Sequence, residues 1–514
     1  MKKKLINNDI IEFLIGISFV MSVYGNILSY YLTGNQNDLV RTIISWGAIF
    51  GIAAILMGYV IQKWFLADIV TKKKIFIYLS PLILNGIMLI SGLVSSGGNY
   101  NIFIECVSFG AYCVPVVCGA VYMILERRFD SVIFKLKYVM LTMLPYYCLA
   151  LTYFWELTTT SGVDGFGGLV YLSIGYSVIP IYAALIYDLI MLFKKNEKVK
   201  MALVIFEMVI CSLIAIATGA RGVLLAWIVI NLAAIMIVIL KKETKILFGV
   251  AISVVSVLLF CILAPTDNMA IGRQFNFINE LKQGKLTESL SSQEGQQLLN
   301  DLFEQANGEQ GLLEIAQGIR DGVNDESRPM EPEATPEVLN PTEPEVTPEV
   351  QKPTGSQGSE GDSNNFQVED GNAGQLDENY KDAVFSITNG SMARSYLWQL
   401  AIKEMQEDPI FGMGAMGYQQ KYSSYTHNIL LECLADFGII VFFIFFMICA
   451  LSFIVLVKKA IKEWKYCGIL LLISGEIIHA MLSGDLYVCP FLLFTFVMAI
   501  EIIVNHKDRH SEVG

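Results

Sequence analysis

The sequence predicts an all-α integral membrane protein: a polytopic helix bundle of about 12 transmembrane helices, with one large extracytoplasmic loop between helices 9 and 10. Composition leads to this fold class. Of the 514 residues, 54% are hydrophobic and only 16% are charged, and the mean hydropathy is +0.53. Such a chain is far too apolar for a soluble domain of this length.

Apolar stretches long enough to cross a bilayer recur along the chain, since a spanning helix needs about 20 mostly apolar residues. The first follows the basic start MKKK and has no small-residue cleavage site after it, so we expect a retained helix rather than a removed signal peptide. The twelve stretches are 10–32, 42–61, 75–95, 102–125, 138–157, 169–193, 201–218, 223–240, 246–264, 428–457, 466–483 and 488–504.

Lysine and arginine indicate the orientation of these helices. They gather in both tails and in alternate short loops, at 63–74, 127–137, 194–200, 241–245 and 458–465. The positive-inside rule places such loops in the cytoplasm. We therefore expect both termini to be cytoplasmic. The expected regions are helices 1 to 9 in 1–264, an extracytoplasmic loop in 265–426, and helices 10 to 12 with the tail in 427–514.

The long loop changes character along its length. Its middle, about 280–380, is acidic and contains PEATPEVLNPTEPEVTPEV, a composition that predicts disorder and argues against a nucleic-acid partner. We interpret it as a flexible insertion; a segment that reaches into the cell envelope is the alternative. The stretch SMARSYLWQLAIKEMQEDP then has the apolar spacing of an amphipathic helix that ends before Pro409. We expect 391–426 to hold this helix and a glycine turn.

That turn, GMGAMG, places Gly412, Gly414 and Gly417 in a literal G-x-G-x-x-G match. A dinucleotide site needs a strand before the motif and a helix opening on it. Here a helix precedes the motif and a membrane span follows, so we reject a nucleotide site. Two alternatives remain, an anion-binding backbone nest and a tight turn that returns the chain to the bilayer, and we favour the turn.

Three polar residues at the outer rim are candidate functional groups, because a charge held within a bilayer is costly and a residue that carries one there usually has a function. Arg221 lies in the short small-residue connection ATGARG, and Arg394 lies in the first turn of the loop helix. His427, followed by Asn428, begins the tenth span and can accept a proton at neutral pH. The alternatives are a snorkelling arginine and a structural histidine.

Two further residues could take part in chemistry at the outer rim. Asp485, in the last outer loop, is a candidate partner for His427, and His479 is a competing base. No Cys-His cluster, HExxH motif or carboxylate pair with metal-ligand spacing occurs, so the sequence supports neither a metal nor another cofactor.

These pieces resemble the bacterial O-antigen polymerase and O-antigen ligase family. The resemblance rests on ATGARG, on RSYLWQLA followed by DPIFGMGAMG, and on THNILLECLADFGIIVFF, and it covers roughly 215–445. The first six spans agree with the family only in hydropathy and number. The acidic insertion is unusually long for such a protein.

The resemblance implies a metal-independent glycosyltransferase of the bacterial cytoplasmic membrane whose donor is a polyprenyl-pyrophosphate-linked oligosaccharide. It implies that Arg221 and Arg394 bind the pyrophosphate and that His427 is the general base. Gly412, Gly414, Gly417, Asn428 and Asp485 are supporting candidates. Besides donor, glycan acceptor and lipid bilayer, candidate partners are a flippase and chain-length regulators.

We expect polymerisation of repeat units for capsule, exopolysaccharide or O-antigen, in preference to ligation of the glycan to a final acceptor. A flippase or another transporter is an alternative from a different class, although such proteins usually show related halves, which we do not find. A non-catalytic envelope scaffold is a weaker alternative.

Overall fold

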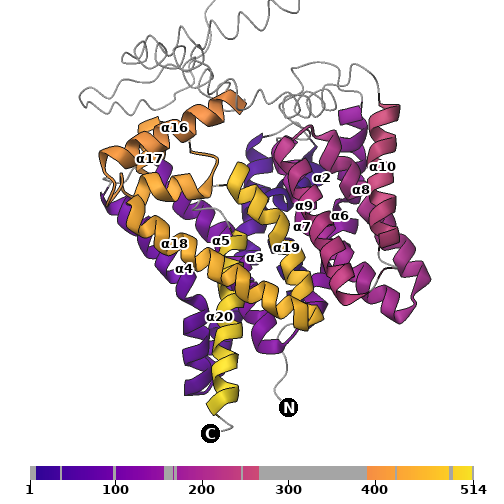
Figure 1. Cartoon of the computed structure of the whole chain (residues 1–514), viewed down its shortest axis with the longest axis horizontal. Coiled ribbons are helices and arrows are strands. Elements are labelled where there is room, and N and C mark those ends of the chain that lie inside the picture. The colour runs from indigo at the N-terminus through magenta and orange to yellow at the C-terminus, as the bar shows by residue number, and fades with distance from the viewer. Residues whose placement is uncertain are drawn as a thin grey trace, which may run out of the picture. The chain divides into compact units, whose positions relative to one another are not determined.

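A computed structural model describes residues 7–34, 38–95, 100–155, 166, 169, 171–242, 244, 247–264, 391–422, 425–484 and 490–511. The regular elements of this part of the chain are α-helices, which confirms the predicted fold class (Figure 1). The acidic stretch 280–380 and Asp485 lie outside the described residues. The predictions made for them are therefore not tested.

The helices follow the predicted apolar segments in order. They are α1 (Asn8–Ser18), α2 (Met21–Thr33), α3 (Asp38–Leu66), α4 (Ile69–Ser95), α5 (Tyr100–Glu126), α6 (Phe129–Trp155), α7 (Tyr171–Lys195), α8 (Lys198–Ala217), α9 (Arg221–Lys241), α10 (Leu247–Leu263), α16 (Ser391–Glu407), α17 (Gly417–Tyr422), α18 (Ile429–Lys462), α19 (Trp464–Leu482) and α20 (Pro490–Ser511).

Among the described residues, nine helices are long and apolar enough to cross a membrane, and the bent pair α1 and α2 makes up to ten. The helices α10 and Pro490–Val504 of α20 are shorter but apolar. Each of the twelve predicted spans thus corresponds to helical structure. The chain is a multi-pass membrane protein.

The first predicted span is not one helix, because α1 and α2 meet at an angle of 102°. At the break, the Ser18 hydroxyl donates to the carbonyl oxygen of Ile15 at 2.6 Å, and Val20 leaves the helical region with φ −127° and ψ 23°. Serine that bonds back to its own helix often accompanies a bend. The expectation of a single long first helix was therefore wrong.

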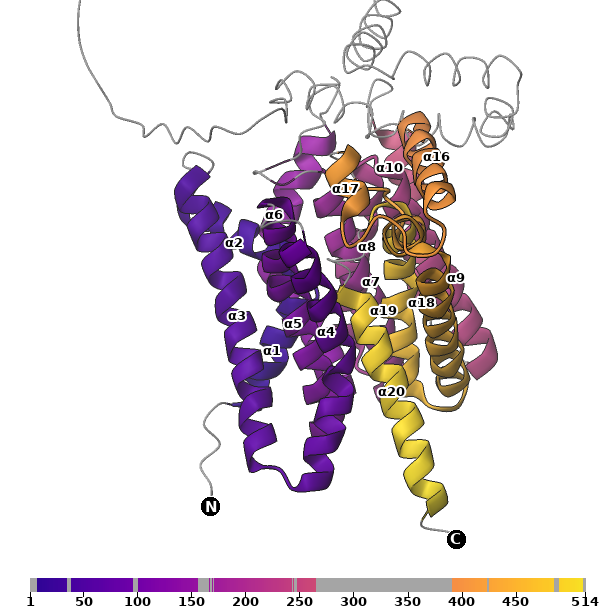
Figure 2. The ribbon, with the colours of Figure 1, turned by 90° about the vertical axis from the view of Figure 1, so that its left-hand side faces the viewer.

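Helix α7 lies at the centre of the bundle. It packs against α6, α8, α9 and α19, and most of its membrane window is buried. Around it, α19 and α20 return beside α18, while α16 and α17 lie at the end of the bundle away from the C-terminal end of α20 (Figure 2). The bundle therefore presents two ends, one of which carries the loop helix α16.

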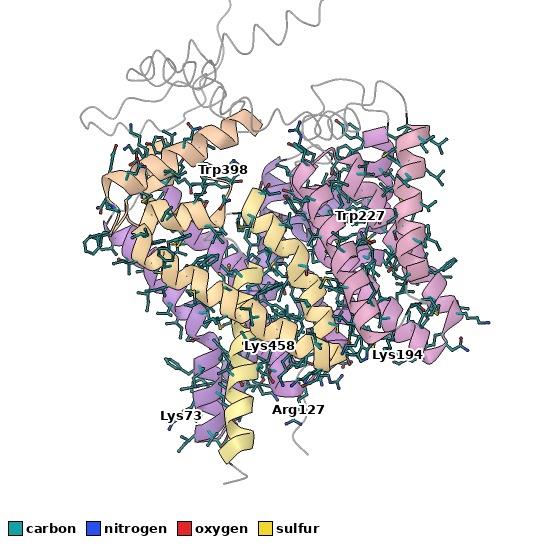
Figure 3. All side chains as sticks on the ribbon, viewed as in Figure 1. Lys73, Arg127, Lys194, Trp227, Trp398 and Lys458 are labelled. Carbon is teal, nitrogen blue, oxygen red and sulfur yellow. The ribbon has the colours of Figure 1, made fainter. Side chains whose placement is uncertain are left out.

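Basic residues mark the other end. Lys73, Arg127, Lys194 and Lys458 lie together at the end opposite Trp398 of α16 (Figure 3). This grouping matches the predicted alternation of basic loops. Which end faces the cytoplasm remains a prediction.

Candidate functional site

His427 lies in the short connection between α17 and α18, and its backbone is unusual. Its φ is +54°, in the left-handed region that residues other than glycine seldom adopt. Hydrogen bonds on either side hold this conformation: the Thr426 hydroxyl donates to the Asn428 carbonyl at 2.8 Å and accepts from the Asn428 N–H at 3.2 Å. Such backbone strain is frequent at functional sites.

Asn428 has a clear local role as the N-cap of α18. Its side-chain oxygen accepts from the N–H groups of Leu430 at 3.0 Å and Leu431 at 3.2 Å. Capping satisfies donors that the first turn of a helix leaves open. Asn428 thus fixes the end of α18 to which His427 is attached. His427 is 8% exposed, and its ring centroid lies 4.1 Å from that of Tyr425.

The loop helix α16 is fastened to this connection. The indole Nε1 of Trp398 donates to the carbonyl oxygen of Thr426 at 2.9 Å, directly before His427. The hydroxyl of Tyr418, in α17, donates to the Leu397 carbonyl at 2.7 Å. Helix α16 also packs along α18. These contacts therefore fix the position of α16 relative to the start of α18.

An ion pair also joins α16 to α17. Glu404 of α16 is buried and accepts from Lys421 of α17 at 2.8 Å and from the Tyr422 hydroxyl. Burial raises the pKa of Glu404, but the hydrogen bonds from Lys421 and Tyr422 and the charge of Lys421 outweigh it and hold the pKa below its ordinary value. Glu404 is therefore an ionised link between α16 and α17 at neutral pH.

Arg394 lies in the first turn of α16, four residues before Trp398, so it occupies the same helix face one turn earlier. Its side chain lies outside the described part of the structure. The helix that carries this predicted pyrophosphate ligand is nevertheless the one bonded to the residue before His427.

The glycine turn is built against a break in α18. Gly438, with φ 73° and ψ 179°, interrupts the helix and frees backbone groups that an unbroken helix would pair. The N–H groups of Met413 and Gly414 donate to the carbonyls of Ala435 at 3.0 Å and Asp436 at 2.8 Å. In return, the Ile439 N–H donates to the Pro409 carbonyl at 2.8 Å. The backbone groups of the turn thus pair with those that the break in α18 leaves open. Backbone groups within a membrane need such partners, because there is no water to bond them.

Asp436 completes this junction. It is fully buried, and its carboxylate accepts from the N–H groups of Met416 and Tyr418, both at 2.9 Å. A carboxylate beside the start of a helix is favourable, so Asp436 caps α17 from within α18. Its carboxylate thereby stabilises the glycine turn.

The three glycines differ in what they allow. A Cβ on Gly412 would lie 2.6 Å from backbone atoms of α18, and one on Gly417 would lie 2.5 Å from the Met413 Cβ. Gly414 has φ +87° but open space around a Cβ. The N–H groups of Gly412, Gly414 and Gly417 all donate to backbone carbonyls. This geometry favours the tight turn over the anion-binding nest.

Arg221 belongs to a neighbouring group of contacts. It is the first residue of α9, after Gly219 with φ +65°. The next residue, Gly222, allows the Tyr176 hydroxyl to approach so closely that a Cβ there would lie 2.1 Å from it. That hydroxyl donates to the Ser483 hydroxyl at 3.2 Å. The start of α9 is thus set against α7 and the end of α19.

His479, the competing base, lies in the same group. Its ring stacks on Tyr176 with centroids 3.9 Å apart, and its Nδ1 lies 3.2 Å from a carboxylate oxygen of Glu476. The sequence does not single out Tyr176, because an aromatic residue inside an apolar span has the pattern of an ordinary core residue.

Both groups lie at the same end of the bundle. At the opposite end, the Lys241 ammonium of α9 donates to the Ile461 carbonyl of α18. Since α9 runs from Arg221 to Lys241 and α18 runs from Ile429 to Lys462, their starts are at the end away from that contact. Helix α19 returns alongside α18, which brings His479 to this end. Within the described residues, no group of three His, Cys, Asp or Glu could hold a metal ion.

One family model matches the chain. Residues 373–446 match the model described as O-antigen ligase, and this segment includes α16, the glycine turn, α17 and the first half of α18. It therefore contains Arg394 and His427 but not Arg221 or His479. No curated protein and no solved structure matches the chain. The predicted resemblance is confirmed over this segment.

Proposed function

We propose that this protein is a glycosyltransferase that joins oligosaccharides carried on a polyprenyl pyrophosphate. The match of residues 373–446 to the family model described as O-antigen ligase supports this proposal. One observation carries the proposal: the hydrogen bond from Trp398 to the Thr426 carbonyl fastens the helix of Arg394 to the residue before His427. This bond would hold the proposed cation for the leaving group and the proposed base for the acceptor on adjoining elements.

The proposed reaction is displacement at the anomeric carbon of the donor. The acceptor hydroxyl oxygen forms the new bond to this carbon, and the bond from the carbon to the pyrophosphate oxygen breaks. The electron pair leaves with polyprenyl pyrophosphate, and the hydroxyl proton passes to the imidazole of His427. General-base catalysis of this kind typically contributes about 10² to 10⁴ in rate.

Arg221 and Arg394 would bind the pyrophosphate. Guanidinium groups bind phosphate oxygens through paired N–H donors and keep their charge at every working pH. They therefore stabilise the charge that develops on the departing pyrophosphate. Because the donor is already activated, neither a nucleotide sugar nor a metal ion is required. The basic loops at the opposite end support a site on the outer face of the cytoplasmic membrane.

Polymerase and ligase reactions share this donor chemistry and differ in the acceptor. We favour polymerisation of repeat units for a surface polysaccharide. Ligation to a final acceptor is the second candidate, and the description of the matched family favours it. Glycans that accumulate in a deletion strain distinguish the two: single lipid-linked repeats indicate a polymerase, whereas long unattached lipid-linked chains indicate a ligase.

The direct test uses purified protein in detergent with a polyprenyl-pyrophosphate oligosaccharide. We expect lengthened or transferred glycan by mass spectrometry, with release of one polyprenyl pyrophosphate for each new linkage. A flippase forms no glycosidic bond in a micelle, where there is no second leaflet to reach. Unchanged donor under conditions in which the protein remains folded would favour transport.

A further inference from the structure

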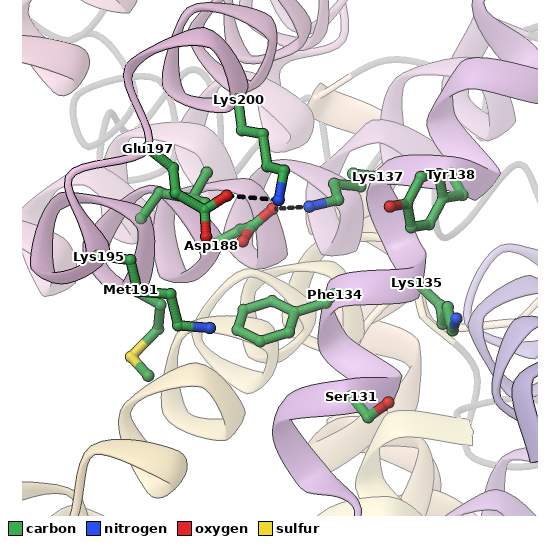
Figure 4. Close-up of a pocket in the computed structure, with 11 residues that line it drawn as sticks. Ser131, Phe134, Lys135, Lys137, Tyr138, Asp188, Met191, Lys195, Glu197 and Lys200 are labelled. Atoms are coloured by element: carbon green, nitrogen blue, oxygen red, sulfur yellow. Dashed lines mark hydrogen bonds and ion pairs between the residues drawn. The ribbon is translucent and has the colours of Figure 1, made fainter.

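A pocket of about 230 Å³ lies at the lysine-rich end of the bundle, opposite the proposed glycosyltransferase site. Helix α6, the end of α7 and the start of α8 enclose it (Figure 4). Its charged lining consists of four lysines and two carboxylates: Lys135, Lys137, Lys195, Lys200, Asp188 and Glu197. Positive charge is therefore in excess.

The lysines are held in place by distinct contacts. Lys137 pairs with the buried Asp188 at 2.8 Å, and its ammonium lies 5.8 Å from the Phe134 ring centroid and 5.4 Å from that of Tyr138. Lys200 pairs with Glu197. These contacts order the two ammonium groups, one carried by α6 and the other by α8, so a ligand in the pocket would meet charges that are already in place.

Lys195 supplies a positive charge outside these two ion pairs. Its ammonium lies 5.7 Å from the Phe134 ring centroid and forms neither a hydrogen bond nor an ion pair with any residue that the structure describes. Lys195 lines the pocket and is exposed. An anion in the pocket would gain this interaction without breaking an existing pair.

The turn that forms one wall has a fixed backbone. Asn196 adopts a left-handed conformation with φ 55°, the Glu197 N–H donates to the Leu192 carbonyl, and the Asn196 N–H donates to the Phe193 carbonyl. This is the hydrogen-bond pattern of a Schellman helix end. The spacing between Lys195 and Lys200 is thereby set by the fold.

The surroundings indicate which anion fits. Tyr138 of α6 and Val199 and Leu203 of α8 are exposed apolar side chains beside the lysines. They belong to helices that are long and apolar enough to cross a membrane, and the pocket lies at the ends of these helices, the level that headgroups would occupy in a bilayer. Basic pockets between membrane helices recognise anionic headgroups.

We propose that this pocket binds the phosphate of an anionic membrane lipid such as phosphatidylglycerol. The phosphate lies between Lys195 and Lys200, and the acyl chains lie over Tyr138, Val199 and Leu203. The site is separate from the proposed glycosyltransferase site and does not depend on that function.

Native mass spectrometry of the purified protein tests the proposal, with phosphatidylglycerol compared with phosphatidylcholine of the same chain length. We expect retained phosphatidylglycerol on the wild type. Each lysine near a lipid phosphate contributes about fivefold in affinity, so the double variant Lys195→Gln, Lys200→Gln should bind roughly 25-fold more weakly.

The matched control is Lys73→Gln, Lys458→Gln, which removes the same charge from the same end of the bundle but outside the pocket (Figure 3). The proposal is overturned if both double variants lose lipid equally, or if neither does. Displacement of the lipid by inorganic phosphate would instead assign the pocket to a soluble anion. If the pocket variant is not recovered folded, Lys200→Gln alone, on an exposed residue, gives the same comparison.

Discussion

Two histidines lie at the same end of the bundle, and the fold holds them in different ways. His427 has a left-handed backbone, and the residue before it, Thr426, accepts a hydrogen bond from the loop helix α16. His479 lies inside the regular helix α19, stacked on Tyr176 and close to Glu476. The position of His427 thus depends on the return of the long loop, whereas that of His479 depends on the bundle alone. Changes in 391–426 should affect one histidine and not the other.

Apart from the replacement of His427, the largest expected effects come from the two arginines, because one belongs to each group. Arg394→Ala and Arg221→Ala should each lower turnover of the lipid-linked donor by about 10² to 10³, the loss typical when a group that stabilises developing charge is removed. Arg127→Ala, at the other end of the bundle, should leave turnover unchanged. If only Arg221→Ala lowers turnover, the reaction would be assigned to the group of contacts around His479.

Two alanine substitutions in the glycine turn distinguish the cost of backbone strain from the cost of steric overlap. Gly412→Ala combines a left-handed alanine with overlap on the α18 backbone, and we expect it to destabilise the fold by roughly 2–5 kcal/mol. Gly414→Ala introduces the strained conformation into open space and should cost about 1 kcal/mol. Thermal unfolding measures both. Equal losses would show that the turn does not pack on the break in α18.

Trp398→Phe tests the link between α16 and His427. It keeps an aromatic ring and removes one hydrogen bond, worth about 1 kcal/mol, so turnover should fall about fivefold. Trp227→Phe is the matched control: it removes a hydrogen bond to Ser212 within the bundle. It should lower stability without a comparable loss of turnover. Equal losses of turnover in the two variants would argue against a specific link.

The smallest expected effect is a pH dependence of the α16 contact. Because the folded pKa of Glu404 is below its ordinary value of 4.5, its contribution to stability is complete above that pH and is lost as the pH falls through the folded pKa. The difference in unfolding temperature between wild type and Glu404→Gln should therefore shrink on acidification. A difference that stays constant with pH would show that Glu404 contributes through packing.

Hydropathy and residue spacing predicted most of the secondary structure. The twelve apolar segments are helical, and the amphipathic pattern of the loop gives α16, which ends at Glu407, before Pro409. These features depend on local sequence, since burial of an apolar face or span has a simple periodicity. The domain boundaries and the catalytic roles remain predictions.

The rest depends on contacts between distant segments. Nothing local to GMGAMG indicates that its N–H groups pair with carbonyls beside Gly438, or that Asp436 caps α17. The bend after Ser18 and the approach of Tyr176 to Gly222 likewise arise from packing between helices. A single sequence contains the residues of such contacts but not their pairing.

The most direct test of the proposed site compares His427→Ala with His479→Ala in the reconstituted glycosyl-transfer assay, with folding checked by thermal unfolding. If His427 is the general base, its replacement lowers turnover by about 10² to 10⁴, and replacement of His479 changes it by a few-fold at most. Unchanged turnover in a folded His427→Ala protein, with loss in His479→Ala, would contradict the proposed role of the α16–His427 junction.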